Sequence, residues 1–567
     1  MTTDQYVRKQ WRARYGTPPG QQQKGAFHHE YPEHVQVVIL DFMQFVKSIG
    51  DQNQTIRQVI REWVNRIKSL FRAHVQYVVV CVDRGSPPVK TIHCHAKRYS
   101  KVKRFGDQDS PILSHNLDKP LHLCGVEDKN WMRLAGNQNL LRREVYPLLW
   151  NALTDPQQFQ LRPGQMLVLS GFPSKMRQVT TVHGLAWERQ FTYKDTAYVA
   201  DQWHLDDVNL SDWPITAAYE QQDPELYRRV FRIVCLDDQR MFVERAPEWE
   251  NDILEADNAV FYFQQVDLFR YRPTMIHIND GDAISIALLQ SHERLKQDNS
   301  FVNHQYICLR YREGKEAAEK RKAIPHERNK PPPRWEYCDV NMLHCMLDKD
   351  PAFFNSGVSN PQLTFVMLNI LAGTDFFANY CPGIGKQYIW QTFFQHAAKM
   401  SHLVQWHACA LQPNPLAPRR AIVDETLFER FTYYVYANKY GKAVRKKNKG
   451  SFTFEILKTY CSQLKRKQNQ VPTQRACKMF ARQLGWNIQY WLNACRNIDI
   501  DPFETWRGFS YWTYQRDKQT QQPQIAYAFS PKQKPMDEAY KRNLYKRKRA
   551  KQPLVQHNQK KKKENPK

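Results

Sequence analysis

The sequence lacks any run of about 18 apolar residues, and residues 1–16 are too polar for a secretory signal. We therefore expect no membrane span and no export signal. Its 12 cysteines include no C-x-x-C pair, which is typical of free thiols in a reducing compartment. His93-Cys94-His95 and Cys338…His344-Cys345 lack a second ligand pair at zinc-finger spacing, so packing is favoured over zinc.

Acidic residues are scarce relative to basic ones. The chain has 56 Asp and Glu against 83 Lys and Arg, a formal charge of +27 at pH 7. A charge excess of this size indicates a polyanionic partner, most simply nucleic acid. Aromatic residues at 13% and hydrophobic residues at 42% predict a folded protein rather than a disordered one.

The 567 residues suffice for two to four domains. The pattern predicts a polar and loosely attached arm (1–30), an α/β core in two parts (31–171 and 251–400), an insertion between them (172–250), a helical region (401–515) and a disordered basic tail (516–567). Within the tail, KRNLYKRKRAK resembles a nuclear localisation signal, which predicts a nuclear protein.

Two predicted strands near the N-terminus both end in an aspartate. Val35–Leu40 precedes Asp41, Tyr77–Val82 precedes Asp83, and a helix with apolar i, i+3, i+4 spacing separates them. Strand–helix–strand order with nearly continuous β-branched strands indicates a parallel sheet covered on both faces. Further elements are predicted as strands at 166–169, 230–236 and 306–309, and as helices at 140–153, 361–373, 428–440, 454–464 and 473–495.

A third apolar run, Met275–Ile278, ends in Asn279-Asp280-Gly281-Asp282. Paired carboxylates at the end of a buried strand repel each other unless a cation meets them. A divalent metal is one solution; an N-capping pair that opens a helix is the other. Because three predicted strands end in acids, we favour the metal.

Two further segments carry candidate binding residues. Asp83 is followed by bases that are positioned to hold a phosphate backbone: Lys90, Lys97, Arg98, Lys101, Lys103 and Arg104. Later, an apolar helix ends before Asp375, and Gly383-Ile384-Gly385-Lys386 opens another helix. Such a turn exposes backbone groups that grip DNA phosphate, directly or through a monovalent cation. The helical region adds bases, including Lys442 and Lys446, that make nucleic-acid contact plausible.

These segments resemble the superfamily of flap endonucleases and 5′–3′ exonucleases, over residues 30–110 and 250–395. The resemblance implies a PIN-like α/β core with a mostly parallel twisted sheet and a site for two Mg²⁺ or Mn²⁺ ions. It assigns as metal ligands Asp41, Asp83, Glu255, Asp257, Asp280, Asp282 and Asp375, and it gives Lys90 and Arg98 catalytic roles. GIGK resembles the family's helix–turn–helix element.

The sequence also departs from the family. It lacks the Gly-rich N-terminus, and an E-x-D stands where the family has E-x-E, with Glu248, Glu250 and Asp252 as rival ligands. The implied function is a metal-dependent 5′ nuclease acting on branched, nicked or 5′-ended DNA. The alternatives are a 5′–3′ exoribonuclease-like enzyme acting on RNA, or a catalytically weak nucleic-acid-binding scaffold.

Overall fold

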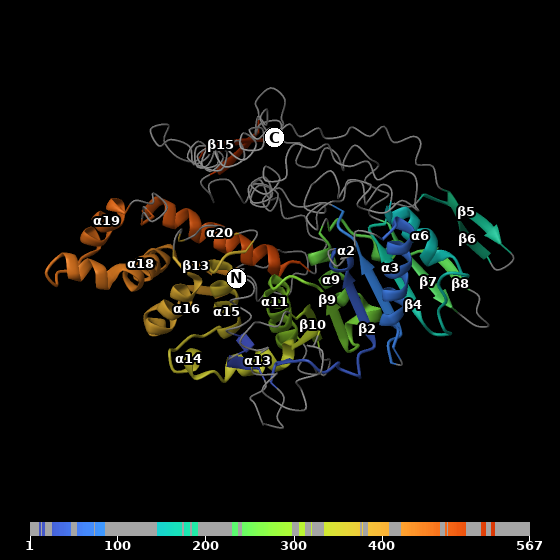
Figure 1. Ribbon diagram of the computed structural model, residues 1–567, viewed down its shortest axis with the longest axis horizontal. Helices are drawn as coiled ribbons and strands as arrows, with labels where there is room; N and C mark the ends of the chain where they lie inside the picture. Colours follow the sequence, from blue (N-terminus) through green and yellow to red (C-terminus); the bar gives the residue numbers. More distant parts are fainter. Residues whose placement is uncertain are drawn as a thin grey trace, which may run out of the picture.

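The computed structural model describes residues 11–12, 14–16, 25–46, 54–72, 74–84, 145–172, 175–181, 184–190, 229–235, 241–253, 255–297, 305–311, 319, 334–374, 377, 381, 384–406, 421–464, 471–472, 474–494, 512–516 and 523–527. These residues form a mixed α/β fold around one large sheet with helices on both faces (Figure 1). Among the described helices, none combines the length and apolarity that a membrane crossing needs.

The central sheet has nine strands in the order β1-β11-β10-β9-β2-β3-β4-β7-β8. Its strands are β1 (Phe27–His28), β2 (Val37–Asp41), β3 (Tyr77–Cys81), β4 (Met166–Ser170), β7 (Val230–Cys235), β8 (Met241–Arg245), β9 (Thr274–His277), β10 (Gln305–Arg310) and β11 (Trp335–Asp339). The middle strands β10, β9, β2, β3 and β4 run parallel, and the strands towards both edges pair antiparallel. The mostly parallel sheet predicted from the β-branched runs is confirmed.

Alternate residues of the buried strands point to opposite faces, so the sheet separates two cores. One core joins Val38 and Val80 to α3 (Ile56–Leu70) and α6 (Tyr146–Thr154). The other joins Ile39 and Val79 to α9 (Ala256–Gln265), α11 (Asp282–Gln297) and α15 (Pro361–Leu371). Parallel strands with both faces covered therefore explain the continuous apolar runs.

Helix α3 follows directly from its sequence. Its apolar residues are all buried: Ile56, Val59, Ile60, Trp63, Val64 and Ile67. Thr55 and Gln58 form a capping box, in which each side chain accepts a hydrogen bond from the other residue's backbone N–H. The predicted helix is thus confirmed, and its start is set by a local cap.

The chain winds outward from β2 in two directions. From β2 it passes through α3 to β3 and then β4 on one side; later β9 pairs with the other side of β2, and α11 leads on to β10. Helices α3 and α11 lie on opposite faces, the arrangement that right-handed crossovers in opposite directions produce. The switch point lies between β2 and β9, where open α/β sheets form a crevice at the strands' carboxyl ends.

The strand predicted within residues 172–250 exists as β7, but it belongs to the central sheet, where it pairs antiparallel with β4. Strand β8 then pairs with β7 at the sheet's edge. This segment also contains a hairpin of β5 (Lys175–Thr181) and β6 (Gly184–Gln190), drawn at the far end of the sheet in Figure 1, and a short 3-10 helix (Pro247–Trp249) after β8.

The N-terminal segment is not loosely attached where it is described. Trp11 is buried with its ring centroid 4.9 Å from that of Phe365, and β1 pairs antiparallel with β11. Arg12 forms an ion pair with the buried Glu336. The expectation of a loose arm is wrong for residues 11–12, 14–16 and 25–28 because apolar and charged partners far along the chain hold them.

The predicted helical region packs on the core. Within its predicted bounds, 401–515, lie α18 (Glu425–Lys447), α19 (Phe454–Gln463) and α20 (Gln474–Leu492), with a small sheet of β12 (Val404–Trp406) and β13 (Ala421–Val423). Helices α16 (Lys386–Gln395) and α17 (Ala397–Met400) directly precede it. The Gln290 side-chain amide on α11 donates to the carbonyls of Trp491 and Leu492 at 3.0 and 2.9 Å. In Figure 1 this region extends from the side of α11 and α15, away from β7 and β8.

The described part of the segment predicted as a disordered tail includes a strand. Strand β15 (Pro523–Tyr527) pairs antiparallel with β14 (Trp512–Arg516), in a register that sets Tyr527 opposite Trp512. Disorder is therefore the wrong prediction for residues 523–527, because β-branched and aromatic residues there find a strand partner. Residues 541–567, including the predicted localisation signal, lie outside the described part of the chain.

Candidate functional site

Acidic residues gather at the carboxyl ends of three adjacent parallel strands. Asp41 is the last residue of β2, Asp83 lies two residues beyond β3, and Asp280 lies three residues beyond β9. The register pairs Asp41 with Cys81 and Leu40 with His277, so the three strands end together. The three strand ends therefore lie side by side at one edge of the sheet.

Asp83 contacts the N-terminus of α9. Its Oδ1 accepts a hydrogen bond of 2.9 Å from the Ala256 backbone N–H, the first residue of that helix. Glu255 precedes the helix and is buried, and Asp257 lies in its first turn. This hydrogen bond joins residues that are 173 positions apart in the sequence, and it places the E-x-D pair beside Asp83.

The rival acids have other partners. Glu248 forms an ion pair with Arg232 at 3.1 Å, and Glu250 forms a two-bond pair with Arg245. Both arginines are on the antiparallel strands β7 and β8. Asp252 is exposed. This geometry favours Glu255 and Asp257 as the acids that accompany Asp83.

Asp41 and Asp280 also meet helix N-termini. Asp41 is 5% exposed, and its Oδ1 accepts from the Met43 N–H at 2.9 Å, at the start of α2 (Met43–Val46). Asp280 Oδ1 accepts from the Asp282 N–H at 3.2 Å, where α11 begins. Helix capping, the alternative to metal binding, therefore accounts for one hydrogen bond of each of these two aspartates. Partial positive charge at these helix ends offsets part of the repulsion among the carboxylates.

A buried arginine that we did not predict lies among these acids. Arg84 is 3% exposed and donates to the Ser170 hydroxyl at 2.8 Å and to the Asn251 carbonyl. Burial raises the pKa of the Cys81 thiol; the Arg84 charge opposes that rise, and the charges of Asp41 and Asp83 add to it. These three charged groups therefore act on one buried point. A base placed directly after a strand-end acid is the sequence signal that would have revealed Arg84.

Gly171 fits this arginine closely. Its φ is +81°, and a Cβ there would lie 2.8 Å from the Val82 carbonyl and 3.1 Å from Arg84 Cγ. Both the left-handed backbone and the close approach require glycine. The backbone just after β4 therefore packs closely against the segment that carries Asp83 and Arg84.

The donor chemistry of these acids fits Mg²⁺ or Mn²⁺, which prefer carboxylate oxygens. Within the described residues, however, no group of three or more His, Cys, Asp or Glu side chains is arranged to hold a metal ion. Asp375 lies outside that part of the chain, as do the predicted phosphate-binding residues Lys90, Lys97, Arg98, Lys101, Lys103, Arg104 and Gly383. The described acids share one edge of the sheet without forming a three-ligand group.

The GIGK segment opens a helix as predicted. Gly385 is the N-cap of α16, and Lys386 is the first helical residue. The φ of Gly385 is −69°, and a Cβ there would meet only the Gln387 side chain, at 3.5 Å. Neither backbone strain nor space therefore demands glycine at 385 in the isolated chain.

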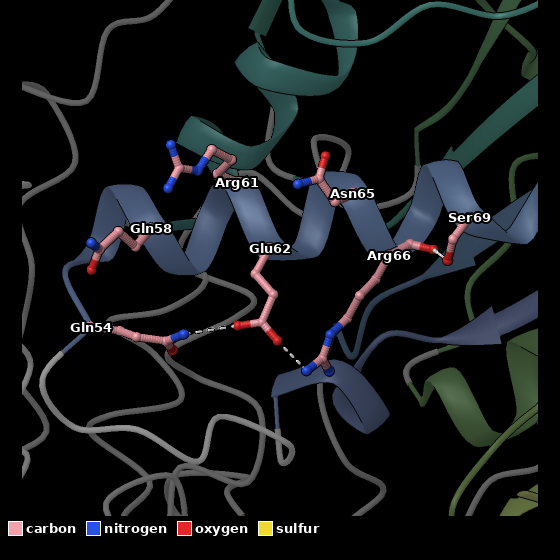
Figure 2. Close-up of a pocket in the computed structure, with 7 residues that line it drawn as sticks. All are labelled: Gln54, Gln58, Arg61, Glu62, Asn65, Arg66 and Ser69. Carbon is pink, nitrogen blue, oxygen red and sulfur yellow. Dashed lines mark hydrogen bonds and ion pairs between the residues drawn. The ribbon is translucent and has the colours of Figure 1, made fainter. Parts of the chain in front are cut away.

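A polar hollow in the described structure lies elsewhere. It is lined by Gln54 and one side of α3: Gln58, Arg61, Glu62, Asn65, Arg66 and Ser69 (Figure 2). Glu62 pairs with Arg66 and accepts from the Gln54 amide at 3.1 Å. Helix α3 packs on the face of the sheet opposite α9, so this open polar hollow is not an extension of the acidic edge.

A comparison of the sequence with models of known protein families found no match, and neither did a comparison with curated proteins.

Proposed function

We propose that this protein is a metal-dependent 5′ nuclease that hydrolyses phosphodiester bonds in branched, nicked or 5′-ended DNA. One observation carries the proposal. An aspartate stands at or within three residues beyond the carboxyl end of each of the adjacent parallel strands β9, β2 and β3, beside the topological switch point where ligand sites of open α/β sheets form. A basic chain that concentrates acids at this place is suited to hold cations against a polyanion.

In this proposal the acids of the three strand ends and of α9, together with Asp375, would hold two Mg²⁺ or Mn²⁺ ions. These acids are Asp41, Asp83, Glu255, Asp257, Asp280, Asp282 and Asp375. Bound there, the ions would activate water and stabilise the leaving oxygen of an in-line displacement. The carboxylates alone repel phosphate, so basic residues have to hold the strand. We assign that task to Lys90 and Arg98, with Lys97, Lys101, Lys103 and Arg104 along the backbone.

DNA is favoured over RNA because Gly385 and Lys386, the last two residues of the GIGK segment, open a helix, as an element that grips duplex backbone would. A monovalent cation at this turn belongs to the same proposal, as does nuclear localisation through KRNLYKRKRAK. An exoribonuclease-like enzyme is the alternative suggested by the spacing from Asp83 to Arg98. A catalytically weak scaffold is the other alternative, favoured by the lack of a three-ligand group within the described residues.

Asparagine substitutions separate metal binding from helix capping. Asn caps helices about as well as Asp but carries no charge. We expect Asp83→Asn and Asp280→Asn each to reduce cleavage of 5′-labelled flap DNA on the order of 100-fold or more in Mg²⁺, because a metal contributes several kcal/mol to the transition state. Melting temperature and DNA affinity should be retained.

Asp252→Asn is the matched control, because Asp252 is exposed and, like Glu255, lies just before α9. It should cleave like the parent protein. Parallel assays on nicked duplex and single-stranded RNA, with and without EDTA, distinguish the alternatives. Preference for RNA would favour the exoribonuclease, and DNA binding without cleavage by the parent would favour the scaffold. Full activity of both Asn variants would show that Asp83 and Asp280 act only as helix caps and do not bind metal.

A further inference from the structure

The C-terminal half of α18 carries positive charge without any negative charge. Between Glu429 and Glu455 the sequence contains no acidic residue, while bases recur through it: Arg430, Lys439, Lys442, Arg445, Lys446, Lys447 and Lys449. All but the last lie on α18. A run of like charge on an ordered helix repels itself, in contrast to the mixed signs that solvated helix faces commonly carry.

Three of these lysines form a row along one side of the helix. Lys439, Lys442 and Lys446 follow i, i+3, i+7 spacing, which places side chains on one face. Gly441 and Val444, on the opposite face, are buried. Lys442 and Lys446 are exposed, and Lys439 is half-buried. We call Lys439, Lys442 and Lys446 the α18 basic stripe.

The stripe begins beside the first turn of α16. Lys439 Nζ lies 4.8 Å from the centre of the Tyr388 ring, and Asn438 donates to the Thr392 hydroxyl at 3.0 Å. Tyr388 is in the first turn of α16, and its N–H bonds to the carbonyl of Gly385. The positive end of the ten-residue helix α16 therefore continues into the lysine row.

The exposed bases of this segment have no acidic partner in the described structure. None of Lys442, Arg445, Lys446 or Lys449 forms an ion pair there, whereas Lys458 on the next helix pairs with Glu455 at 2.9 Å. Cations in the last turn of a helix stabilise its dipole, which accounts for Arg445, Lys446 and Lys447. That effect does not account for Lys439 and Lys442, which precede the last turn.

We propose that the α18 basic stripe binds the phosphodiester backbone of a nucleic acid, as a contact separate from the acidic edge of the sheet. The stripe spans about 10 Å at 1.5 Å per residue, or about three nucleotide steps of 3.4 Å. Isolated ammonium groups in a row match phosphates, whose charges repeat regularly and carry no sequence information. The inference rests on the nucleic-acid ligand proposed above, but it does not require cleavage.

The test measures binding of the full chain in EDTA, so that loss of nuclease activity cannot affect the result. The probes are a fluorescein-labelled 20-base-pair duplex, a 20-nucleotide single strand and poly-glutamate. We expect Lys442→Glu with Lys446→Glu to weaken DNA binding on the order of tenfold at 0.1 M salt. The milder Lys442→Ala with Lys446→Ala should lower the slope of log K against log[salt] by about 1.8 on duplex, about 0.9 for each contact.

Lys68→Glu with Lys349→Glu is the control, because both lysines are exposed, lie elsewhere and give the same change in net charge. It should retain DNA binding almost fully, and circular dichroism should show all variants folded. Equal weakening by both pairs would overturn the proposal, since only overall charge would matter. Unchanged DNA binding with lost poly-glutamate binding would also overturn it in favour of an acidic protein partner.

Discussion

At the scale of single residues, His277 is the least compensated polar group in the parallel part of the sheet. It is 6% exposed, and neither ring nitrogen has a hydrogen-bond partner within the described structure. Its ring contacts Trp335 edge to face, with centroids 5.8 Å apart. Burial, assisted by the charge of Arg72, lowers the pKa of His277 to about 4. The imidazole is therefore neutral in the folded state at neutral pH.

A buried neutral histidine makes stability depend on pH. Between about pH 6.5 and 4 the unfolded chain binds a proton that the folded chain does not, so stability falls as pH falls through this window. At pH 4 and below, keeping His277 buried lowers the free energy of unfolding by about 3 kcal/mol. We expect His277→Leu to flatten the dependence of urea-unfolding free energy on pH in this range and to raise stability at pH 5. An unchanged slope would show that another group titrates there.

Two glycines with similar backbone angles give a second residue-scale prediction. Gly164 has φ +79° and Gly171 has φ +81°, but a Cβ at 164 would meet nothing within 4 Å. Gly164→Ala should cost about 1 kcal/mol, the penalty of left-handed backbone alone. Gly171→Ala should cost at least about 2 kcal/mol more, because Val82 and Arg84 have to move. Urea unfolding of both variants measures the difference in the free energy of unfolding. Equal costs would mean that Val82 and Arg84 can move to accept a Cβ at residue 171 without loss of stability.

At the scale of elements, Asp350 joins the N-terminal segment to the start of α14 (Pro351–Phe354). It accepts hydrogen bonds from the Tyr15 hydroxyl at 2.7 Å, from Arg14 and from the Ala352 N–H at 2.9 Å. Burial by itself raises the pKa of the Asp350 carboxyl, but the bonds from Arg14 and Tyr15 outweigh it, and the net shift is downward. One ionised carboxylate thus holds segments more than 300 residues apart.

Because its pKa is lowered in the folded state, Asp350 stabilises the protein above the ordinary aspartate pKa of about 3.9, and this stabilisation is lost as pH falls further. We expect Asp350→Asn, which keeps the helix cap, to cost about 1–3 kcal/mol at pH 7 through the lost charged bonds. The gap from the parent should narrow at pH 3. Urea midpoints at the two pH values test this, and a gap independent of pH would assign the loss to packing.

At the scale of the whole molecule, charge is segregated rather than evenly spread. The chain carries +27 overall, yet acids collect where β9, β2 and β3 end, and lysines collect along α18. At 0.1 M salt, fields of exposed charges fade over about 10 Å, so the two regions act as distinct local environments. This separation is what the proposed nuclease requires: one place that attracts cations and others that hold the substrate's backbone.

The sequence by itself determined the elements whose signals are local. Continuous apolar runs predicted β2, β3 and β9, and apolar residues at i, i+3, i+4 spacing predicted α3, because side-chain patterns report directly on strand and helix geometry. The aspartates after those strands could be placed at one edge, because neighbouring parallel strands share their carboxyl ends. The start of α16 was equally readable from its glycine turn.

Only the tertiary structure decided what depends on contacts between distant residues. Pairing of β7 with β4, and of β1 with β11, uses backbone hydrogen bonds that have no side-chain signature. Nothing local indicates that Asp83 meets α9 or that Arg84 bonds to Ser170 and Asn251, because these contacts follow from how separate segments pack together. The periodicity of apolar residues predicts which face of a helix or strand is buried, but it does not predict which other element packs against that face.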